Sequence, residues 1–425
     1  MRCNRLALVT LIAGLAATPA SAQTLKQQVN ELFRFGECGE ALCLEVNSAV
    51  HGLHYAPSAT QASGALIGFF ADAIGSAISN IPISSSSGGV TFTFRGGRPV
   101  RTSVSSGPIF AERGQTLGKG QILTGANATS LSFSTFRGVP LDQLNFNFSH
   151  QNVGVPAYGD PSFENDVIQV RTDLKINVFV SSFFATYGLL DRLDVGVAIP
   201  VVRASLDGTS YGSIQPFGGT SPHFFGTPAS PTLTATGTTE GSSVGIGDIA
   251  LRMKANLSRS EQSSFALFGD VRLPTGDADN FRGAGSLTAR VLGAYSGRYN
   301  NFSPHINAGV LVRTDSLQNN AAIAIIGFDQ LISTSWTLAF DVLTEYQLGD
   351  NKVELPDPVQ LTVPFTRTIT PTNIPGTKDH VVSGSLGAKY TTKRGVTAVV
   401  NALVPIKLGG LQPRIAFTAG LEYGF

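Results

Sequence analysis

The chain ends on "PRIAFTAGLEYGF" (413–425), in which apolar residues alternate with polar or small ones and an aromatic residue comes last. Successive side chains of a β-strand point to opposite faces, so this alternation predicts a strand with one apolar face. That face carries Ile415, Phe417, Ala419, Leu421, Tyr423 and Phe425. A chain end frays unless it is tied down. We therefore expect another strand of the same chain to pair with this one.

The same alternation recurs from about residue 120 onward. It is found near 143–150, 170–180, 193–201, 249–257, 265–273, 286–296, 304–314, 321–329, 336–348, 380–392 and 395–407. Several runs are 11 residues or longer, whereas strands of soluble proteins usually run about 5–6 residues. The stretch "WTLAFDVLTEYQL" (336–348) has aromatic residues at both ends. Ten residues at ~3.3 Å each, tilted by about 40°, cover roughly the 25 Å apolar band of a membrane barrel.

The connections predict how these strands are arranged. Short turns near 137–142, 187–191, 258–262, 297–303, 330–335 and 391–395 alternate with longer loops, chiefly near 151–165, 207–243, 274–285 and 349–378. Outer-membrane barrels have short turns on the periplasmic side and long loops outside. With "GGVTFTFRG" (88–96) added, the sequence predicts an all-β, transmembrane antiparallel β-barrel over 89–425, with about 14 strands in a range of 12–16. A large soluble all-β protein is the alternative.

The N-terminus and the composition agree with export. Arg2 and Arg5, an apolar run and the small residues before Gln23 predict a cleaved signal peptide over 1–22. Charged residues make up only 14% of the chain, and 30 basic residues stand against 29 acidic ones. This even and sparse charge argues against nucleic-acid binding, which needs a clustered basic surface. We therefore expect a bacterial outer membrane with lipopolysaccharide as the surroundings.

The last strand suggests a further partner. Pairing it with the first strand would close the barrel and remove its unpaired edges. Leu421, Tyr423 and Phe425 resemble the C-terminal signal that the barrel-assembly machinery reads in bacterial outer-membrane proteins.

Residues 23–88 differ from the rest and do not alternate. They hold an amphipathic stretch, "LKQQVNELFRF", and a mostly apolar helix candidate, "ASGALIGFFADAIGSAISNI". Cys38 and Cys43 are expected to form a disulfide, as is usual after export. Metal binding with His51 and His54 is the alternative, since two thiolates alone do not complete a zinc site. The segment is expected to be a hatch in the barrel or a periplasmic arm.

The inward-facing positions of the strands mix charges with apolar side chains. The lumen charges are Arg252, Asp270, Arg272 and Arg290, and the apolar residues include Phe268, Leu292, Leu311, Ile323 and Leu343. A general porin has a polar, water-filled interior, whereas apolar pockets with a few polar anchors suit small hydrophobic ligands.

Four blocks carry a family resemblance: "GPIFAERGQTLGKGQILTGANATSLSFSTFRG" (107–138), "YGLLDRLDVGVAIPVV" (187–202), "GIGDIALRMKANL" (245–257) and "DVRLPTGDADNFRGAG" (270–285). They resemble the outer-membrane family linked to the meta-pathway of phenol degradation, which is similar to FadL-type channels for hydrophobic compounds. The resemblance covers roughly 90–425. It implies a 14-stranded barrel with an N-terminal hatch and passive uptake of hydrophobic small molecules. The Asn-Pro-Ala stretch of a FadL hatch is missing, and a cysteine pair stands in residues 23–88 instead.

The leading hypothesis is therefore a channel for passive uptake of small hydrophobic or aromatic compounds, without a cofactor. The expected lining residues are Ile67, Phe69, Phe70, Phe268 and Leu311. An enzyme is not expected, because the six histidines are scattered and lack a nucleophile partner in the sequence. The alternative is a structural or adhesive barrel that acts through its long extracellular loops.

Overall fold

The computed structural model describes residues 23–35, 42, 45–46, 64–79, 81, 92–95, 98–101, 105–149, 166–216, 223–315, 318–352, 355, 357–362 and 365–425. The expected signal peptide and both cysteines of the expected disulfide, Cys38 and Cys43, lie outside these residues.

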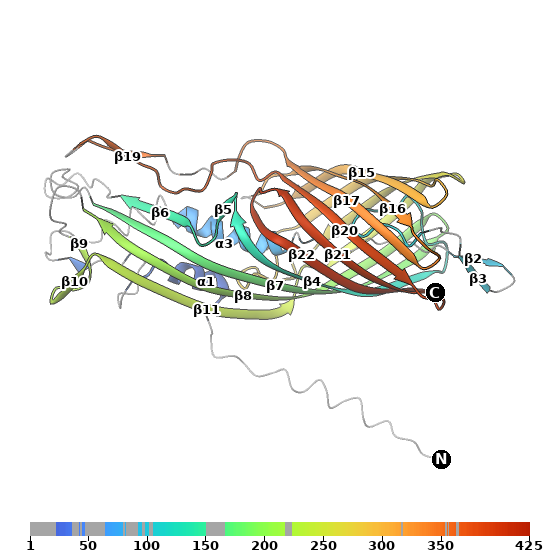
Figure 1. The fold of residues 1–425 in the computed structure, drawn as a ribbon, viewed down its shortest axis with the longest axis horizontal. Helices are drawn as coiled ribbons and strands as arrows, with labels where there is room; N and C mark the ends of the chain where they lie inside the picture. Colours follow the sequence, from blue (N-terminus) through green and yellow to red (C-terminus); the bar gives the residue numbers. More distant parts are fainter. Residues whose placement is uncertain are drawn as a thin grey trace, which may run out of the picture.

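Twelve antiparallel strands close into a barrel (Figure 1). In order around the wall they are β4 (Ile122–Phe136), β7 (Val167–Leu190), β8 (Leu193–Gln215), β12 (Ala250–Arg259), β13 (Ser263–Arg272), β14 (Thr288–Gly297), β15 (Phe302–Arg313), β16 (Ala321–Leu331), β17 (Trp336–Gln347), β20 (Val381–Thr391), β21 (Val396–Lys407) and β22 (Leu411–Gly424). Each neighbour in the ring is antiparallel, so every wall strand is hydrogen-bonded on both sides. The all-β antiparallel barrel expected from the alternation is confirmed.

The last strand closes the barrel, as expected. β22 pairs with β4 over Leu411–Gly424, with a bulge between Gln412 and Ala416. At the rim the two backbones exchange hydrogen bonds, with Ile122 N–H to Phe425 O at 2.8 Å and Phe425 N–H to Ile122 O at 2.9 Å. Because the barrel is closed, the wall has no open edge. A sheet in the bilayer core needs this, since lipid cannot hydrogen-bond to unpaired backbone groups.

Two strands run far beyond the barrel. β7 has 24 residues and β8 has 23, twice the length of most other wall strands. Val167–Thr172 of β7 pairs with β6 (Leu144–Ser149), and Val201–Ser213 of β8 pairs with β11 (Thr234–Ile246). β6, β7, β8 and β11 thus form a four-stranded extension beyond the rim opposite the C-terminus, as Figure 1 shows.

The extension explains where the expected strand count differs. The run at 143–150 forms β6, which pairs with β7 alone and does not cross the wall. The run at 88–96 contains β2 (Phe92–Arg95), which forms a separate hairpin with β3 (Arg98–Arg101). The ring therefore has twelve strands rather than about fourteen, at the lower end of the expected range. The turn near 137–142 consequently lies at the long-loop rim and not at the periplasmic one, and much of the expected loop 207–243 is strand.

Two helices pack at the extension. α1 (Leu25–Glu31) begins with a capping box, because the Thr24 side chain accepts the Gln27 N–H and the Gln27 side chain accepts the Thr24 N–H. α3 (Gly64–Ser79) follows, and Phe70 packs edge-on against Phe136 of β4 at 5.2 Å between ring centroids. Both helices belong to one buried apolar core with β4, β6, β7 and β8. The helix expected in "ASGALIGFFADAIGSAISNI" is therefore confirmed as α3.

The remaining elements are short strands. They are β1 (Glu45–Val46), β5 (Val139–Pro140), β9 (His223–Thr227), β10 (Ser230–Thr232), β18 (Val359–Leu361) and β19 (Arg367–Ile369). None of the helices described is long and apolar enough to span a membrane.

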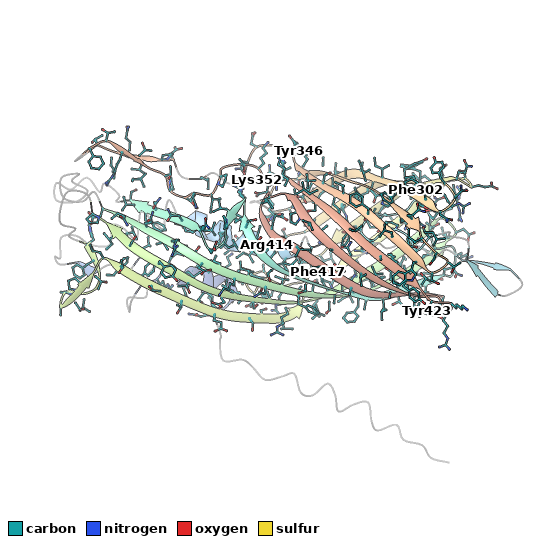
Figure 2. The ribbon with its side chains drawn as sticks, in the orientation of Figure 1. Phe302, Tyr346, Lys352, Arg414, Phe417 and Tyr423 are labelled. Carbon is teal, nitrogen blue, oxygen red and sulfur yellow. The ribbon has the colours of Figure 1, made fainter. Side chains whose placement is uncertain are left out.

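The outer face of the barrel is an apolar belt. Every wall strand except β4 presents large apolar side chains that are more than a third exposed, among them Leu251, Leu267, Val291, Val310, Ile326, Leu386, Val400 and Leu421. Aromatic residues gather at the rim near the C-terminus. The ring centroids of Trp336 and Tyr390 are 4.9 Å apart there, and those of Tyr423 and Phe425 are 5.5 Å apart. Figure 2 shows Tyr423 at this rim and Phe417 farther along the wall. A lipid-facing barrel wall has this composition, with aromatic girdles at its interfaces.

Candidate functional site

Residues 105–117, here called the lumen plug, fill the half of the lumen near the C-terminal rim. All of them except Gln115 are buried, and the segment forms no regular secondary structure. Ile109 and Phe110 pack against Ala339 of β17 and Val399 of β21. The plug precedes β4 directly, so it enters the barrel from the rim where the wall begins.

Hydrogen bonds join the plug backbone to side chains of wall strands, including β12, β14 and β15. The Asn307 amide accepts the Glu112 N–H at 2.6 Å and donates to the Glu112 carbonyl at 2.8 Å. Gly114 donates to Ser296 Oγ at 3.1 Å and accepts from Asn256 Nδ2 at 2.7 Å. A Cβ on Gly114 would lie 2.4 Å from the Ser264 carbonyl oxygen, so only glycine fits this approach. These bonds satisfy an irregular backbone that would otherwise be buried unpaired.

Charged side chains hold the plug as well. The Arg113 guanidinium lies 2.5 Å from the Asp329 carboxylate, which also accepts a hydrogen bond from Ser105 Oγ. His305 connects Asp329 to Asp341, at 3.6 Å and 2.6 Å. Lys254 of β12 lies 3.3 Å from Glu112. His305, one of the six scattered histidines, is therefore part of the structure that anchors the plug.

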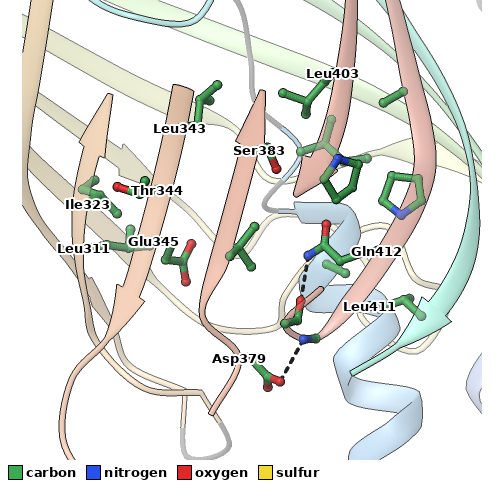
Figure 3. Close-up of a pocket in the computed structure, with 18 of the residues that line it drawn as sticks. Leu311, Ile323, Leu343, Thr344, Glu345, Asp379, Ser383, Leu403, Leu411 and Gln412 are labelled. Carbon is green, nitrogen blue, oxygen red and sulfur yellow. Dashed lines mark hydrogen bonds between the residues drawn. The ribbon is translucent and has the colours of Figure 1, made fainter. Parts of the chain in front are cut away.

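A cavity of about 260 Å³ lies between the plug and α3 (Figure 3). Phe110 of the plug lines it, and so do Ala73, Ala77 and Ile81 at the α3 end. Most of its wall is apolar, with Leu131, Phe133, Phe136, Leu311, Ile323, Ile325, Leu343, Leu403, Leu411 and Ala416. Figure 3 shows Leu311, Ile323 and Leu343 on neighbouring strands and Leu403 across the cavity.

One side of the cavity carries the predicted lumen charges. Asp270 of β13 lies 3.1 Å from Arg252, 3.6 Å from Arg272 and 3.5 Å from Arg290. Arg313 of β15 continues this side and pairs with Glu345 at 2.8 Å. The sequence predicted only that Arg252, Asp270, Arg272 and Arg290 face inward. In the structure these four residues lie together in one cluster.

The expected lining residues have different positions. Leu311 lines the cavity. Phe268 is fully buried in the wall with the Arg290 guanidinium 5.6 Å above its ring, and Phe70 packs on Phe136 instead of lining the cavity. Ile67 and Phe69 belong to α3, but their side chains are outside the described part of the structure. Leu421, Tyr423 and Phe425 face outward and are between 41% and 58% exposed.

The plug was not expected at this place. The sequence assigned the hatch to 23–88 and included 105–117, which packs in the lumen, in the range assigned to the barrel wall. "SSGPIFAERGQTL" has no strand or helix period. The adjacent charged residues Glu112 and Arg113 among apolar residues were the available signal, since charged side chains are rarely buried without partners. Among the described residues, no group of three His, Cys, Asp or Glu side chains is placed to hold a metal ion.

A family model described as "Putative MetA-pathway of phenol degradation" matches residues 142–402. The chain belongs to this family. The match runs from β6 into β21, and so includes most of the strands that line the cavity but not β4 and β22.

Solved structures of outer-membrane proteins are similar at low identity. An outer-membrane channel from Pseudomonas putida F1 has 11% identity and a TM-score of 0.43, over 73% of this chain and 97% of that one. A FadL homologue from Pseudomonas aeruginosa has 12% identity and a TM-score of 0.30, over 72% and 89%. The P. putida toluene transporter TodX has 9% identity and a TM-score of 0.32, over 72% and 89%. No curated protein matches.

Proposed function

We propose that the protein is a channel of the bacterial outer membrane for passive uptake of small hydrophobic or aromatic compounds. The observation that carries this is an apolar cavity inside a barrel whose outer face is also apolar. Lipopolysaccharide hinders such compounds from partitioning directly into the membrane, so a protein path is needed. Membership of a family described by phenol degradation supports an aromatic substrate.

The path would run from the extension, past α3 and through the cavity to the plug. α1 and α3, with the rest of residues 23–88, would form a hatch at the extension end of the lumen, with 89–425 as the channel body. The plug blocks the other end, so passage requires that residues 105–117 move. We also propose a cleaved signal peptide over 1–22, and Leu421, Tyr423 and Phe425 as the signal for the barrel-assembly machinery.

A matched pair of substitutions tests the path. Ile325 is 8% exposed and lines the cavity, whereas its neighbour Ile326 is 57% exposed on the outer face. Ile325→Trp should fill the cavity, and Ile326→Trp should only enlarge a lipid-facing side chain. Each variant is produced in a Gram-negative strain lacking the protein, and uptake of labelled benzyl alcohol by intact cells is measured.

We expect uptake to fall to the deletion level with Ile325→Trp and to match the wild type with Ile326→Trp, at equal amounts of folded barrel in the outer membrane. If the wild-type gene does not raise uptake above the deletion strain, the channel proposal is wrong. The structural or adhesive reading would then take its place.

A further inference from the structure

The charged side of the cavity has more guanidinium than carboxylate groups. Arg252, Arg272 and Arg290 surround the single carboxylate of Asp270, at 3.1–3.6 Å. The side chains come from β12, β13 and β14, where Asp270 is directly opposite both Arg252 and Arg290. Asp270 is 2% exposed, so this cluster is screened from bulk water.

The neighbouring acidic residues have hydrogen-bond or ion-pair partners of their own. Asp248 shares a small adjoining cavity with Arg272 and accepts the N–H groups of Gly276 and Ala284. The other two acids of the main cavity have their own arginines: Glu345 pairs with Arg313, and Asp379 with Arg137. Within the described part of the chain, the three arginines gather around Asp270, and Asp248 is the next carboxylate beside Arg272.

Arg290 is the member that faces the cavity. Its side chain is 23% exposed, the guanidinium lies above the Phe268 ring, and the Asp270 contact is long at 3.5 Å. Arg290 Nε is buried and has no hydrogen-bond partner within the described part of the chain. Burying a donor and a charge without full compensation is unfavourable. An anion bound in the cavity would recover that cost.

The apolar side begins directly beside this arginine. Leu311 is the cross-strand neighbour of Arg290, and Ile323 and Leu343 continue the apolar side across β16 and β17. The volume of about 260 Å³ is below the roughly 300–1,000 Å³ of pockets for drug-sized ligands. The cavity therefore suits a small molecule with an anionic end and an apolar body.

We propose that the cavity binds a small amphipathic carboxylate with one ring or a short chain. Its carboxylate accepts hydrogen bonds from Arg290 and Arg272, because the planar guanidinium fork matches a carboxylate. Its apolar body lies against Leu311, Ile323 and Leu343. This inference rests on the proposed function and narrows its substrate class.

The test compares benzoate with benzyl alcohol, two molecules of similar shape that differ in charge at neutral pH. Binding of each to the purified full-length mature protein is measured by calorimetry for the wild type, Arg290→Gln, Arg290→Lys and Arg203→Gln. Arg203 is an exposed arginine of β8 outside the cavity and serves as the matched control. Heat-modifiable gel migration shows that each variant is folded.

We expect the wild type and Arg203→Gln to bind benzoate at least about tenfold more tightly than benzyl alcohol, the size expected of a charge-assisted hydrogen bond. Arg290→Gln should remove this preference and leave benzyl alcohol binding within about twofold, and Arg290→Lys should keep part of it. An equal benzoate preference in Arg290→Gln and the wild type overturns the carboxylate site but leaves the channel proposal intact. Binding of neither compound by the wild type overturns the carboxylate site, and the Ile325 uptake experiment then decides the channel separately.

Discussion

The ion pair between Arg113 of the plug and Asp329 of the wall should control how often the lumen opens. Asp329→Asn keeps the size of the side chain and removes its charge. The Asp329 side chain has no exposed surface and that of Arg113 is 10% exposed, so solvent hardly screens the pair. Removing one member of a buried pair costs about 3–5 kcal/mol. If this free energy is lost from docking of the plug, the fraction of open channels rises about 100-fold to a few thousand-fold.

Single-channel recording in planar bilayers measures this fraction. The matched control is Asp207→Asn, which neutralises an exposed aspartate on the extension of β8. The wild type and the control should be closed almost all the time, while Asp329→Asn should show frequent openings of one size. Arg113→Met should act in the same direction. The double variant should open less than either single variant, because no unpaired charge is left in the wall.

Equal open probability of Asp329→Asn and Asp207→Asn, with both proteins folded, would refute the reasoning. The plug would then be held by its backbone hydrogen bonds alone, or would not block conduction. A further result that contradicts it is an additive double variant, since additivity means that the two side chains do not interact.

Four further outcomes are expected. Phe136→Ala removes the ring that packs on Phe70 and should weaken α3 docking by about 3–5 kcal/mol. Proteases should therefore cut this variant near residues 64–79 faster than they cut the control Phe417→Ala, which changes an outward-facing side chain. Equal cleavage rates would contradict the packing of Phe136 on Phe70. Gly188→Ala should prevent assembly of folded barrel, because its Cβ would lie 1.8 Å from the Gly118 carbonyl oxygen, and normal amounts in the outer membrane would show that the rim can shift. Deletion of Phe425 should also lower the amount of assembled barrel, through loss of its two hydrogen bonds to Ile122; an unchanged amount in membrane fractions argues against a role in assembly. Burial raises the pKa of Asp277, but hydrogen bonds from Asn280 and Arg282 outweigh it, so that pKa is lowered in the folded protein; the stabilisation is therefore present above the ordinary value and is lost as the pH falls. The 277–280 turn binds the start of α1 through Asp279 and Asn280. Pepsin should therefore cut α1 of Asp277→Asn faster than the wild type at pH 5, and the difference should shrink as the pH falls below the ordinary pKa of an aspartate.

The wall was predictable because lipid outside and packed side chains inside impose a period of two. Runs such as "VRTDLKINVFV" (170–180) show it directly, and their order along the chain gave the ring apart from two strands. β11 was missed because "TATGTTEGSSVGI" (234–246) has few apolar residues. It pairs with β8 beyond the wall, where neither lipid nor a tight core selects one apolar face.

The candidate site was harder to predict than the wall. Arg252, Asp270, Arg272 and Arg290 could be placed on the inner face, but the sequence gives no register between strands, so the three arginines around one carboxylate were not foreseen. The plug was missed for a different reason. Its residues are fixed by partners up to 231 positions away, such as Asn256 with Gly114 and Thr337 with Ser106, and no local pattern encodes those contacts.

The seam between β22 and β4 has a consequence for secretion. Its two strands are the last and the first of the wall, so the ring cannot close before the final residue has left the translocation machinery. Until then every other wall strand can be present and paired, yet the sheet has two open edges and an apolar outer face in contact with water. Such a sheet is prone to pair with other chains. Protection from such pairing is therefore needed over nearly the whole chain until its C-terminal strand is in place.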